Sequence, residues 1–322
     1  MLSPLEKSIL ATVSYFDIFN YPLTSFEIYK YLLSPNGHEL NATFFEIKKT
    51  LDGYSSLQKK IQTREGFYFL SGRESIISTR KERYIIAEEK FRQAKRFIKF
   101  LSKLPFINSI YICNSLSYSN ARPESDIDLA IICRPKTIWL VRMLAAGLTD
   151  FLRKRPAEDN LKNKICLSFY TCIDNLSMEK YQSECPDVHF IYWQSQFLPI
   201  YVGNENIFFK NNTWSKKYLP NQINQSVNQK RAIINQSKMK KHCENLICDA
   251  IIKYLNKKAK KYQLKIMPAR LKVAAQEPNT NVVLDDDIIK LHSNDKRQEF
   301  NQRWRIKYKS ILNYYEQTQE NN

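Results

Sequence analysis

The sequence predicts an α+β fold in which helical ends surround a central β-sheet. Apolar runs of strand length occur at 107–113, 126–133 and 164–172, and a segment of helical periodicity separates the last two. Helical patterns dominate both ends of the chain, and a hairpin pattern closes the first helical part. We therefore expect an N-terminal part, a connecting helix, a core and a basic helical C-terminal region, at 1–73, 74–104, 105–205 and 206–322.

The N-terminal part is predicted to form three short helices and a hairpin. Residues 4–20 place apolar side chains at helical spacing, and a Tyr-Pro pair ends that helix. Two Thr-x-x-Glu capping boxes open the next two helices, at 26–33 and 44–51. The hairpin pattern follows at 60–70. This succession of elements resembles a winged helix.

The third helix of this part differs from a DNA-reading helix. In DNA-binding winged helices that helix enters the major groove. Here Lys48 and Lys49 are its main polar donors, and Phe44 and Phe45 would be wasted in a groove. We expect a packing or substrate-presenting role rather than sequence-specific DNA binding.

A pair of carboxylates opens the second apolar run of the core. Asp126 and Asp128 precede Leu-Ala-Ile-Ile-Cys, a pattern typical of a strand buried on both faces. Residues two apart on a strand share a face. Two carboxylates on one face repel each other, and a bound divalent cation removes that repulsion. The pair therefore indicates a metal site.

A small polar turn follows the first apolar run of the core. It contains Asn114, Ser115 and Ser117, and it comes between a predicted strand and a predicted helix. Backbone N–H groups at the start of a helix face an anion, so this arrangement suits a phosphate. A metal site beside a phosphate site indicates phosphoryl or nucleotidyl transfer.

These residues resemble the nucleotidyltransferase superfamily that includes DNA polymerase beta and the aminoglycoside nucleotidyltransferases. Members carry Gly-Ser after the first strand and Asp-x-Asp at the start of the next. Here Ser115 and the run Ser-Asp-Ile-Asp-Leu from Ser125 stand at the matching distance. Asn114 replaces the usual glycine, and Ser119 stands where many members have a second one. Asn is the next most tolerant residue of positive φ, so we expect the turn to form.

The resemblance covers roughly the middle third of the chain and implies a polymerase-beta-like core with a mixed sheet. It implies that Asp126 and Asp128 are catalytic and bind Mg²⁺ or Mn²⁺. A nucleoside triphosphate such as ATP would be the co-substrate, and a hydroxyl acceptor would displace pyrophosphate. The residues implied to hold the triphosphate are Asn114, Ser115, Ser117 and Ser125.

Active members usually place a third carboxylate on a following strand, as the base for the acceptor hydroxyl. The strand predicted at 164–172 contains none, and Asp174, just past its end, is the nearest candidate, with Glu184 and Asp187 further away. Three alternatives remain open: Asp174 is the base, metal alone activates the acceptor, or the site binds without turnover. The alternative function is therefore a catalytically inactive nucleotide sensor or DNA-binding regulator on the same fold.

The charge of the chain indicates polyanionic partners. The formal net charge is +18, and 23 Lys and Arg against 10 Asp and Glu between 210 and 322 place about +13 of it in the C-terminal region. This clustering suits a contact with nucleic acid, although genome composition explains part of the charge. The acceptor remains open between a small molecule, an RNA end and a protein hydroxyl.

The remaining C-terminal patterns are mainly helical. Residues 231–262 have helical periodicity, the three aspartates at 285–287 suit a helix start, and His292 is expected to be exposed. Seven cysteines without a Cys-x-x-Cys pair indicate reduced, mostly buried thiols. The chain shows no signal-like start and no apolar run of about 18 residues. We expect a cytoplasmic protein with no membrane contact.

Overall fold

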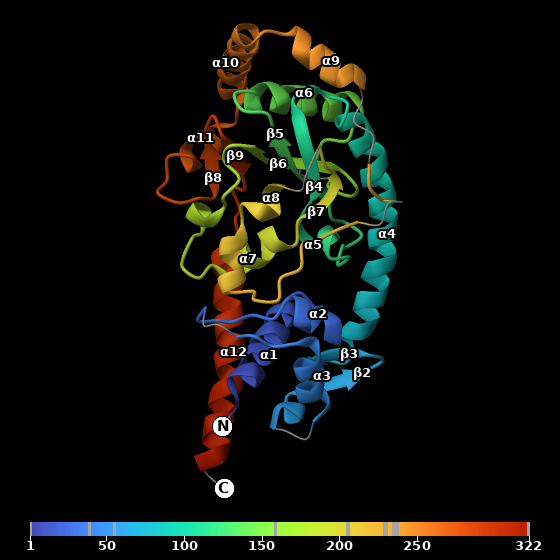
Figure 1. Cartoon of the computed structure of the whole chain (residues 1–322), viewed down its shortest axis with the longest axis vertical. Helices are drawn as coiled ribbons and strands as arrows, with labels where there is room; N and C mark the ends of the chain where they lie inside the picture. The colour runs from blue at the N-terminus through green and yellow to red at the C-terminus, as the bar shows by residue number, and fades with distance from the viewer. Residues whose placement is uncertain are drawn as a thin grey trace.

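A mixed six-stranded sheet forms the centre of the computed structural model (Figure 1). The structure describes residues 2–37, 40–53, 56–157, 160–203, 207–227, 231–233 and 238–320. β5 and β6 are parallel, whereas the other paired strands are antiparallel. In sheet order, the strands are β7 (Leu198–Tyr201), β4 (Ile107–Ile112), β5 (Ile127–Cys133), β6 (Ile165–Cys172), β9 (Ile288–Leu291) and β8 (Val282–Leu284).

Helices cover both faces of this sheet, so its central strands are buried. A parallel pair needs a crossover, and the helix between β5 and β6 supplies it. That helix packs on β6 and is covered by α10, while α4 contributes to the same hydrophobic core. Side chains of α7 and α8 pack on the opposite face. The helices are α4 (Ile76–Leu101), α6 (Ile138–Phe151), α7 (Val188–Ser195), α8 (Ile207–Lys210) and α10 (Asp249–Ile266).

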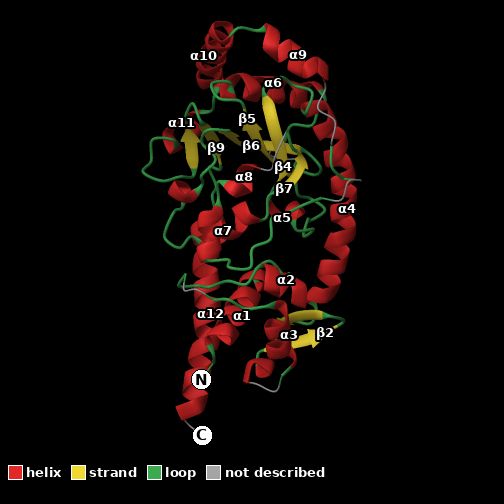
Figure 2. Ribbon diagram, viewed as in Figure 1, coloured by secondary structure: helices red, strands yellow, loops and turns green. Residues whose placement is uncertain are grey.

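Three helices and a small sheet make up the N-terminal part, as the sequence predicts (Figure 2). Capping boxes at Thr24 and Thr43 start the second and third helices, because each threonine accepts from the N–H of the glutamate that in turn bonds its own N–H. The elements are α1 (Pro4–Asp17), α2 (Ser25–Lys30), α3 (Phe44–Asp52), β1 (Leu23–Thr24), β2 (Ile61–Arg64) and β3 (Phe67–Leu70), with sheet order β1-β3-β2.

Two long helices join the N-terminal part to the core. α4 runs along one side of the molecule, and α12 (Arg297–Glu320) lies on the other side, against α1 and α7 (Figure 1). The indole of Trp304 on α12 is buried in the N-terminal hydrophobic core and donates to the carbonyl of Ala11 at 3.1 Å. The end of the chain therefore helps to fix the N-terminal part on the sheet.

The C-terminal region differs from the predicted helices in two places. The helix predicted at 231–262 is represented by α9 (Lys238–Leu246) and α10, with a break between them, and residues 234–237 lie outside the described residues. The aspartates at 285–287 do not start a helix. They form the turn between β8 and β9, which extend the core sheet beyond β6.

The remaining short helices are α5 (Asn114–Ser117), α11 (Ala269–Ala274) and 3₁₀ turns at Ser56–Lys59, Glu179–Tyr181 and Thr213–Lys217. Within the described part of the chain, none of the helices combines the length and apolar character needed to cross a bilayer.

Candidate functional site

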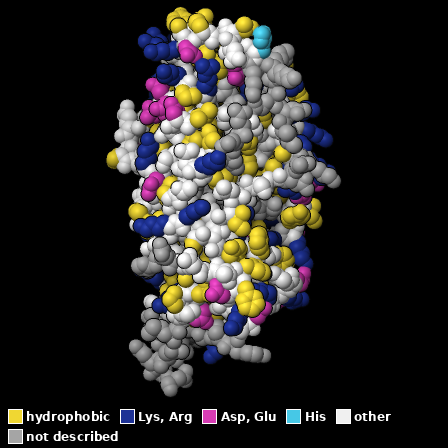
Figure 3. Space-filling model, viewed as in Figure 1, with side chains coloured by type: hydrophobic (Ala, Val, Ile, Leu, Met, Phe, Trp, Pro, Cys, Tyr) yellow, Lys and Arg dark blue, Asp and Glu magenta, His cyan; other side chains and the backbone are white. Residues whose placement is uncertain are grey.

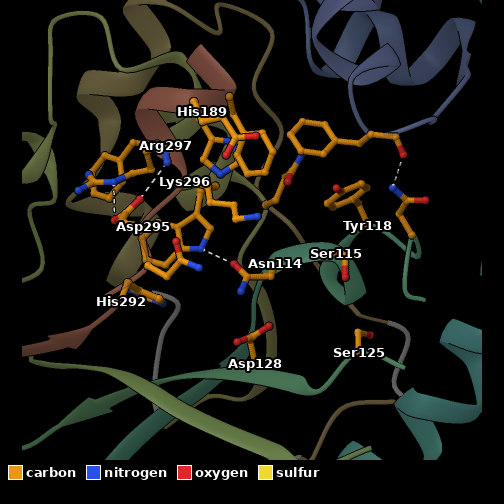
Figure 4. Close-up of a pocket in the computed structure, with 18 of the residues that line it drawn as sticks. Asn114, Ser115, Tyr118, Ser125, Asp128, His189, His292, Asp295, Lys296 and Arg297 are labelled. Atoms are coloured by element: carbon orange, nitrogen blue, oxygen red, sulfur yellow. Dashed lines mark hydrogen bonds and ion pairs between the residues drawn. The ribbon is translucent and has the colours of Figure 1, made fainter. Parts of the chain in front are cut away.

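A cavity of about 520 Å³ lies where the core sheet, α1, α7 and the start of α12 meet. Asp128 and Ser125 lie on the sheet side in Figure 4, whereas His189 and Lys296 lie on the opposite side. Both Asp126 and Asp128 line this cavity. The carboxylate pair predicted from the sequence therefore faces a space large enough for a ligand.

The turn that carries Asn114 has a left-handed backbone at Asn114 and at Ser119, the two positions where the sequence comparison expects glycine. Asn114 has φ +56° and Ser119 has φ +59°, so both occupy the region that favours glycine. The Asn114 side chain is also used: Trp193 donates its indole N–H to Asn114 Oδ1 at 2.7 Å, and the Asn114 amide hydrogen-bonds to Asp128. The turn forms as predicted, and asparagine adds contacts that glycine lacks.

Asp126, Asp128 and Cys166 form one cluster at the floor of the cavity. Cys166 on β6 lies in register with Asp128 on β5, and the ligand atoms of all three lie within 4.8 Å of one another. Burial, and then the charge of Asp126, raise the pKa of Asp128 to about 7. Burial also raises the pKa of Asp126 above its usual value. Ionising both carboxylates is unfavourable here, and a divalent cation would remove that cost.

The loop that presents Asp126 is held by a buried lysine of α4. Lys90 Nζ donates to the carbonyls of Ser125 at 2.6 Å and Pro123 at 3.2 Å, and to Asn163 Oδ1 at 2.9 Å. These bonds tie the loop before β5 to the loop before β6. The positive charge of Lys90 also offsets part of the rise that burial causes in the pKa of Asp126.

Replacing Lys90 by methionine should destabilise the protein. The side chain is almost fully buried, and without it the Pro123 carbonyl and Asn163 Oδ1 would lose this donor, while the Ser125 carbonyl would keep only the N–H of Asn163. Each buried group left unsatisfied costs about 1–3 kcal/mol, and we expect the free energy of unfolding to fall by roughly 2–4 kcal/mol. Chemical denaturation measures this. Lys99→Met, on the exposed side of the same helix, is the control and should change stability by less than about 0.5 kcal/mol; equal effects of the two substitutions would contradict the assigned role.

Asp174 is not part of this cluster, so its assignment as the third carboxylate is wrong. Asp128 pairs with Cys166 at the start of the parallel strands, whereas Asp174 follows their far ends, past Cys172. Six residues at about 3.3 Å each separate the two ends by roughly 20 Å. Asp174 lies instead beside Cys172 and Asp287, outside the cavity.

The other acidic candidates have structural partners. Asp187 is buried, caps α7 by accepting from the N–H of Phe190 at 3.0 Å, and also accepts from the Asn301 amide at 2.9 Å. Glu184 forms an ion pair with Arg305 at 2.8 Å. Neither lines the cavity.

The predicted phosphate-binding residues divide into two groups. Asn114, Ser115 and Ser125 line the cavity. Ser117 does not: it is buried, and its hydroxyl donates to the carbonyl of Asn114 at 2.7 Å. Ser117 therefore stabilises the turn, and its assignment to a phosphate is wrong.

Four basic side chains that the sequence did not indicate line one side of the cavity, and we call them the basic wall. Arg83 comes from α4 and Arg122 from the loop before β5. Lys296 immediately precedes α12, and Arg303 lies in that helix. Burial, and then the charge of Arg122, lower the pKa of Arg83. Glu299 also lines this side and lies 3.6 Å from Arg303. These residues are far apart in the sequence, so no local motif could indicate them.

Two histidines that line the cavity are half-buried and neutral. Burial lowers the pKa of His189 to about 4, and its Nδ1 lies 2.9 Å from the Tyr15 hydroxyl. Burial, and then Lys290, lower the pKa of His292 to about 3. His292 Nε2 lies 3.1 Å from Ser168 Oγ, and its Nδ1 is buried without a hydrogen-bond partner among the described residues. The expectation of an exposed His292 is wrong.

An ion-pair cluster fixes α12 beside β9. Asp295 lies 2.6 Å from Lys290 Nζ and 2.8 Å from Arg297 Nε, and all three side chains are nearly buried. Arg297 Nη1 also lies 3.5 Å from the buried carboxylate of Asp187, so two carboxylates balance the two cations, and the cluster positions the basic wall rather than adding to its charge.

Comparison with known proteins identifies no relative, so the function of the cavity is inferred from its geometry alone. No protein-family model matches the chain, and neither does any curated protein or any solved structure.

Proposed function

We propose that this chain is a metal-dependent nucleotidyltransferase, which moves a nucleoside monophosphate from a nucleoside triphosphate to a hydroxyl acceptor and releases pyrophosphate. One observation carries the proposal: a pair of carboxylates and a group of cations face the same cavity. A metal-bound triphosphate has the complementary charges, because its cation suits the carboxylates and its phosphates suit the basic wall.

Asp126 and Asp128 would hold the metal. Their oxygen atoms lie close enough to share one ion, and their raised pKa values support a site that gains from a bound cation. A bound Mg²⁺ or Mn²⁺ would supply Lewis-acid stabilisation and orientation of the phosphates. Asn114 would orient Asp128 through the hydrogen bond between them.

The other residues of the cavity would bind the nucleotide. Arg83 and Arg122 would contact phosphate oxygens, with Ser115 and Ser125 as hydroxyl donors. Tyr118, Trp193 and Phe300 also line the cavity and offer flat apolar surfaces for a nucleobase.

The arrangement of elements supports a polymerase-beta-like core and a winged helix. The antiparallel-then-parallel order of β4, β5 and β6 puts the start of β5 beside the turn after β4. The three N-terminal helices and the hairpin support the winged helix. Tyr15 of α1 and Phe19, which follows this helix, line the cavity, and this favours a substrate-presenting role for the N-terminal part.

The base for the acceptor hydroxyl separates this proposal from its alternative. Within the described residues, Cys166 rather than a third carboxylate completes the cluster. The chain would therefore rely on metal to activate the acceptor. The same observation favours the alternative, a nucleotide sensor on the same fold that binds without turnover.

Labelled nucleotides distinguish the two functions. The chain is incubated with labelled ATP, CTP, GTP or UTP and Mg²⁺ or Mn²⁺, and label is measured on protein, RNA and small molecules. Metal-dependent transfer supports the transferase. Metal-dependent binding without transfer to any acceptor supports the sensor. Nucleotide binding of the same affinity with and without metal would exclude the transferase.

A contact with nucleic acid through the C-terminal region gives a further prediction. α10 carries exposed lysines at 253, 257, 258, 261 and 265, and Figure 3 shows basic side chains near this end of the molecule. If they contact about six or more phosphates, affinity for RNA or DNA should fall by orders of magnitude between roughly 50 and 200 mM salt. Binding in a salt titration should weaken further in a variant with these lysines changed to glutamine. An affinity that does not change with salt would mean that the positive charge of the C-terminal region reflects genome composition rather than a nucleic-acid contact.

A further inference from the structure

Cys166 occupies the position on β6 that faces the carboxylate pair. Its Sγ lies within 4.8 Å of ligand oxygens of both Asp126 and Asp128, and β-sheet register places it beside Asp128. The thiol hydrogen-bonds to both carboxylates. A cation that binds the two carboxylates would therefore meet sulfur as its third neighbour.

A serine and a histidine lie beside this thiol. Ser168 follows Cys166 on β6, at the point where the register between β5 and β6 shifts. Ser168 Oγ lies 3.1 Å from His292 Nε2, and the Ser168 hydroxyl also hydrogen-bonds to the Cys166 thiol. His292 lines the same cavity, and its buried Nδ1 has no partner within the described part of the chain. His292 is not one of the three clustered ligands, but its unpartnered nitrogen is consistent with a ligand that binds in this cavity.

We propose that Asp126, Asp128 and Cys166 form an oxygen, oxygen and sulfur site that prefers a zinc-like divalent ion to Mg²⁺. Thiolate is a soft ligand that selects Zn²⁺ and its neighbours, whereas Mg²⁺ prefers an all-oxygen octahedral shell. The inference rests on the proposed function, which already places a cation at the two carboxylates, and it adds the third ligand and the class of metal. His292 and Ser168 would act as positioning residues for the thiol.

Binding requires the thiol to lose its proton. The S–H bond breaks, the sulfur lone pair forms the bond to the metal ion, and the proton passes to the buffer. The carboxylates disfavour a thiolate while the metal is absent, and the positive ion reverses this preference.

Cobalt(II) is the probe for this site, because it replaces zinc and its bond to a thiolate absorbs in the near ultraviolet. The whole chain is titrated with Co²⁺ in the absence of nucleotide. The charge-transfer band should appear in the wild type and in Cys185→Ser, which removes an exposed thiol. It should be lost in Cys166→Ser, and affinity for Co²⁺ and Zn²⁺ should fall by about ten- to a hundredfold while affinity for Mg²⁺ stays within about threefold.

A second variant tests the preference in the other direction. Cys166→Asp should bind Mg²⁺ more tightly than the wild type and show no band, because the site then offers three carboxylates. Should this variant fail to fold, Cys166→Ser carries the test alone, since serine is close to cysteine in size.

Three outcomes would overturn the inference: no Co²⁺ binding, binding without the band, or a band that survives in Cys166→Ser. The experiment is independent of turnover. A chain that shows the band but transfers no label keeps the metal site and loses the transferase. A chain that transfers label with Mg²⁺ and shows no band keeps the transferase and loses the sulfur ligand.

Discussion

Asp126→Asn/Asp128→Asn should abolish metal-dependent nucleotide binding and transfer. The two carboxylates are the oxygen ligands at the floor of the cavity, and asparagine keeps their size but removes both charges. A metal ion supplies several kcal/mol of transition-state stabilisation, so transfer should fall by roughly 10³-fold or more. Calorimetry with nucleotide and metal should show only the weak, metal-independent binding that the basic wall provides.

Asp174→Asn is the matched control for this substitution. It makes the same chemical change in a carboxylate at the far end of the parallel strands, beside Cys172 and Asp287. Transfer and nucleotide binding should remain at the wild-type level. A large loss of kcat in Asp174→Asn alone would restore this residue as a base and would contradict the strand register. A double variant that binds metal and nucleotide like the wild type would place the site elsewhere.

The local parts of the fold and site were predictable from the sequence. Capping boxes, helical spacing and strand length depend on neighbouring residues, and the helices that begin after Thr24 and Thr43 confirm this. Positive φ at Asn114 also followed from residue type at one position. These features need no knowledge of how distant segments pack.

The errors arose where distant segments meet. Alternation along a strand puts Asp126 and Asp128 on one face, but only the parallel pairing shows that Asp174 lies at the opposite end. The three aspartates at 285–287 are compatible with a helix start and with a turn. They form a turn because β8 and β9, on either side of them, pair with each other. Arg83 and Arg303 are separated by most of the chain, and only the packing of α4 and α12 brings them to one cavity.

The pH dependence of the free energy of unfolding tests whether the carboxylate pair is unfavourable when it is charged. Asp128 has a pKa of about 7 in the folded protein and an ordinary value of 3.8, so between these values the folded chain holds a proton that the unfolded chain has released. Its contribution to stability is complete below about pH 4 and is lost as the pH rises through 7. Without metal, Asp126→Asn/Asp128→Asn should match the wild type near pH 4 and exceed it by roughly 2–4 kcal/mol at pH 8.

Taking the difference between the two proteins removes the opposing effect of the histidines. His189 and His292 are neutral in the folded state with pKa values of about 4 and 3, so their contribution is present above about pH 6.5 and is lost as the pH falls. Both proteins contain them, so they cancel. Denaturation in the presence of chelator, from pH 4 to pH 8, measures the difference in the free energy of unfolding between the two proteins. In a second experiment, saturating metal without chelator should reverse the sign of this difference, because only the wild type binds the ion. A difference that stays constant across this range would mean that the carboxylates do not repel each other, and the case for a cation between them would fail.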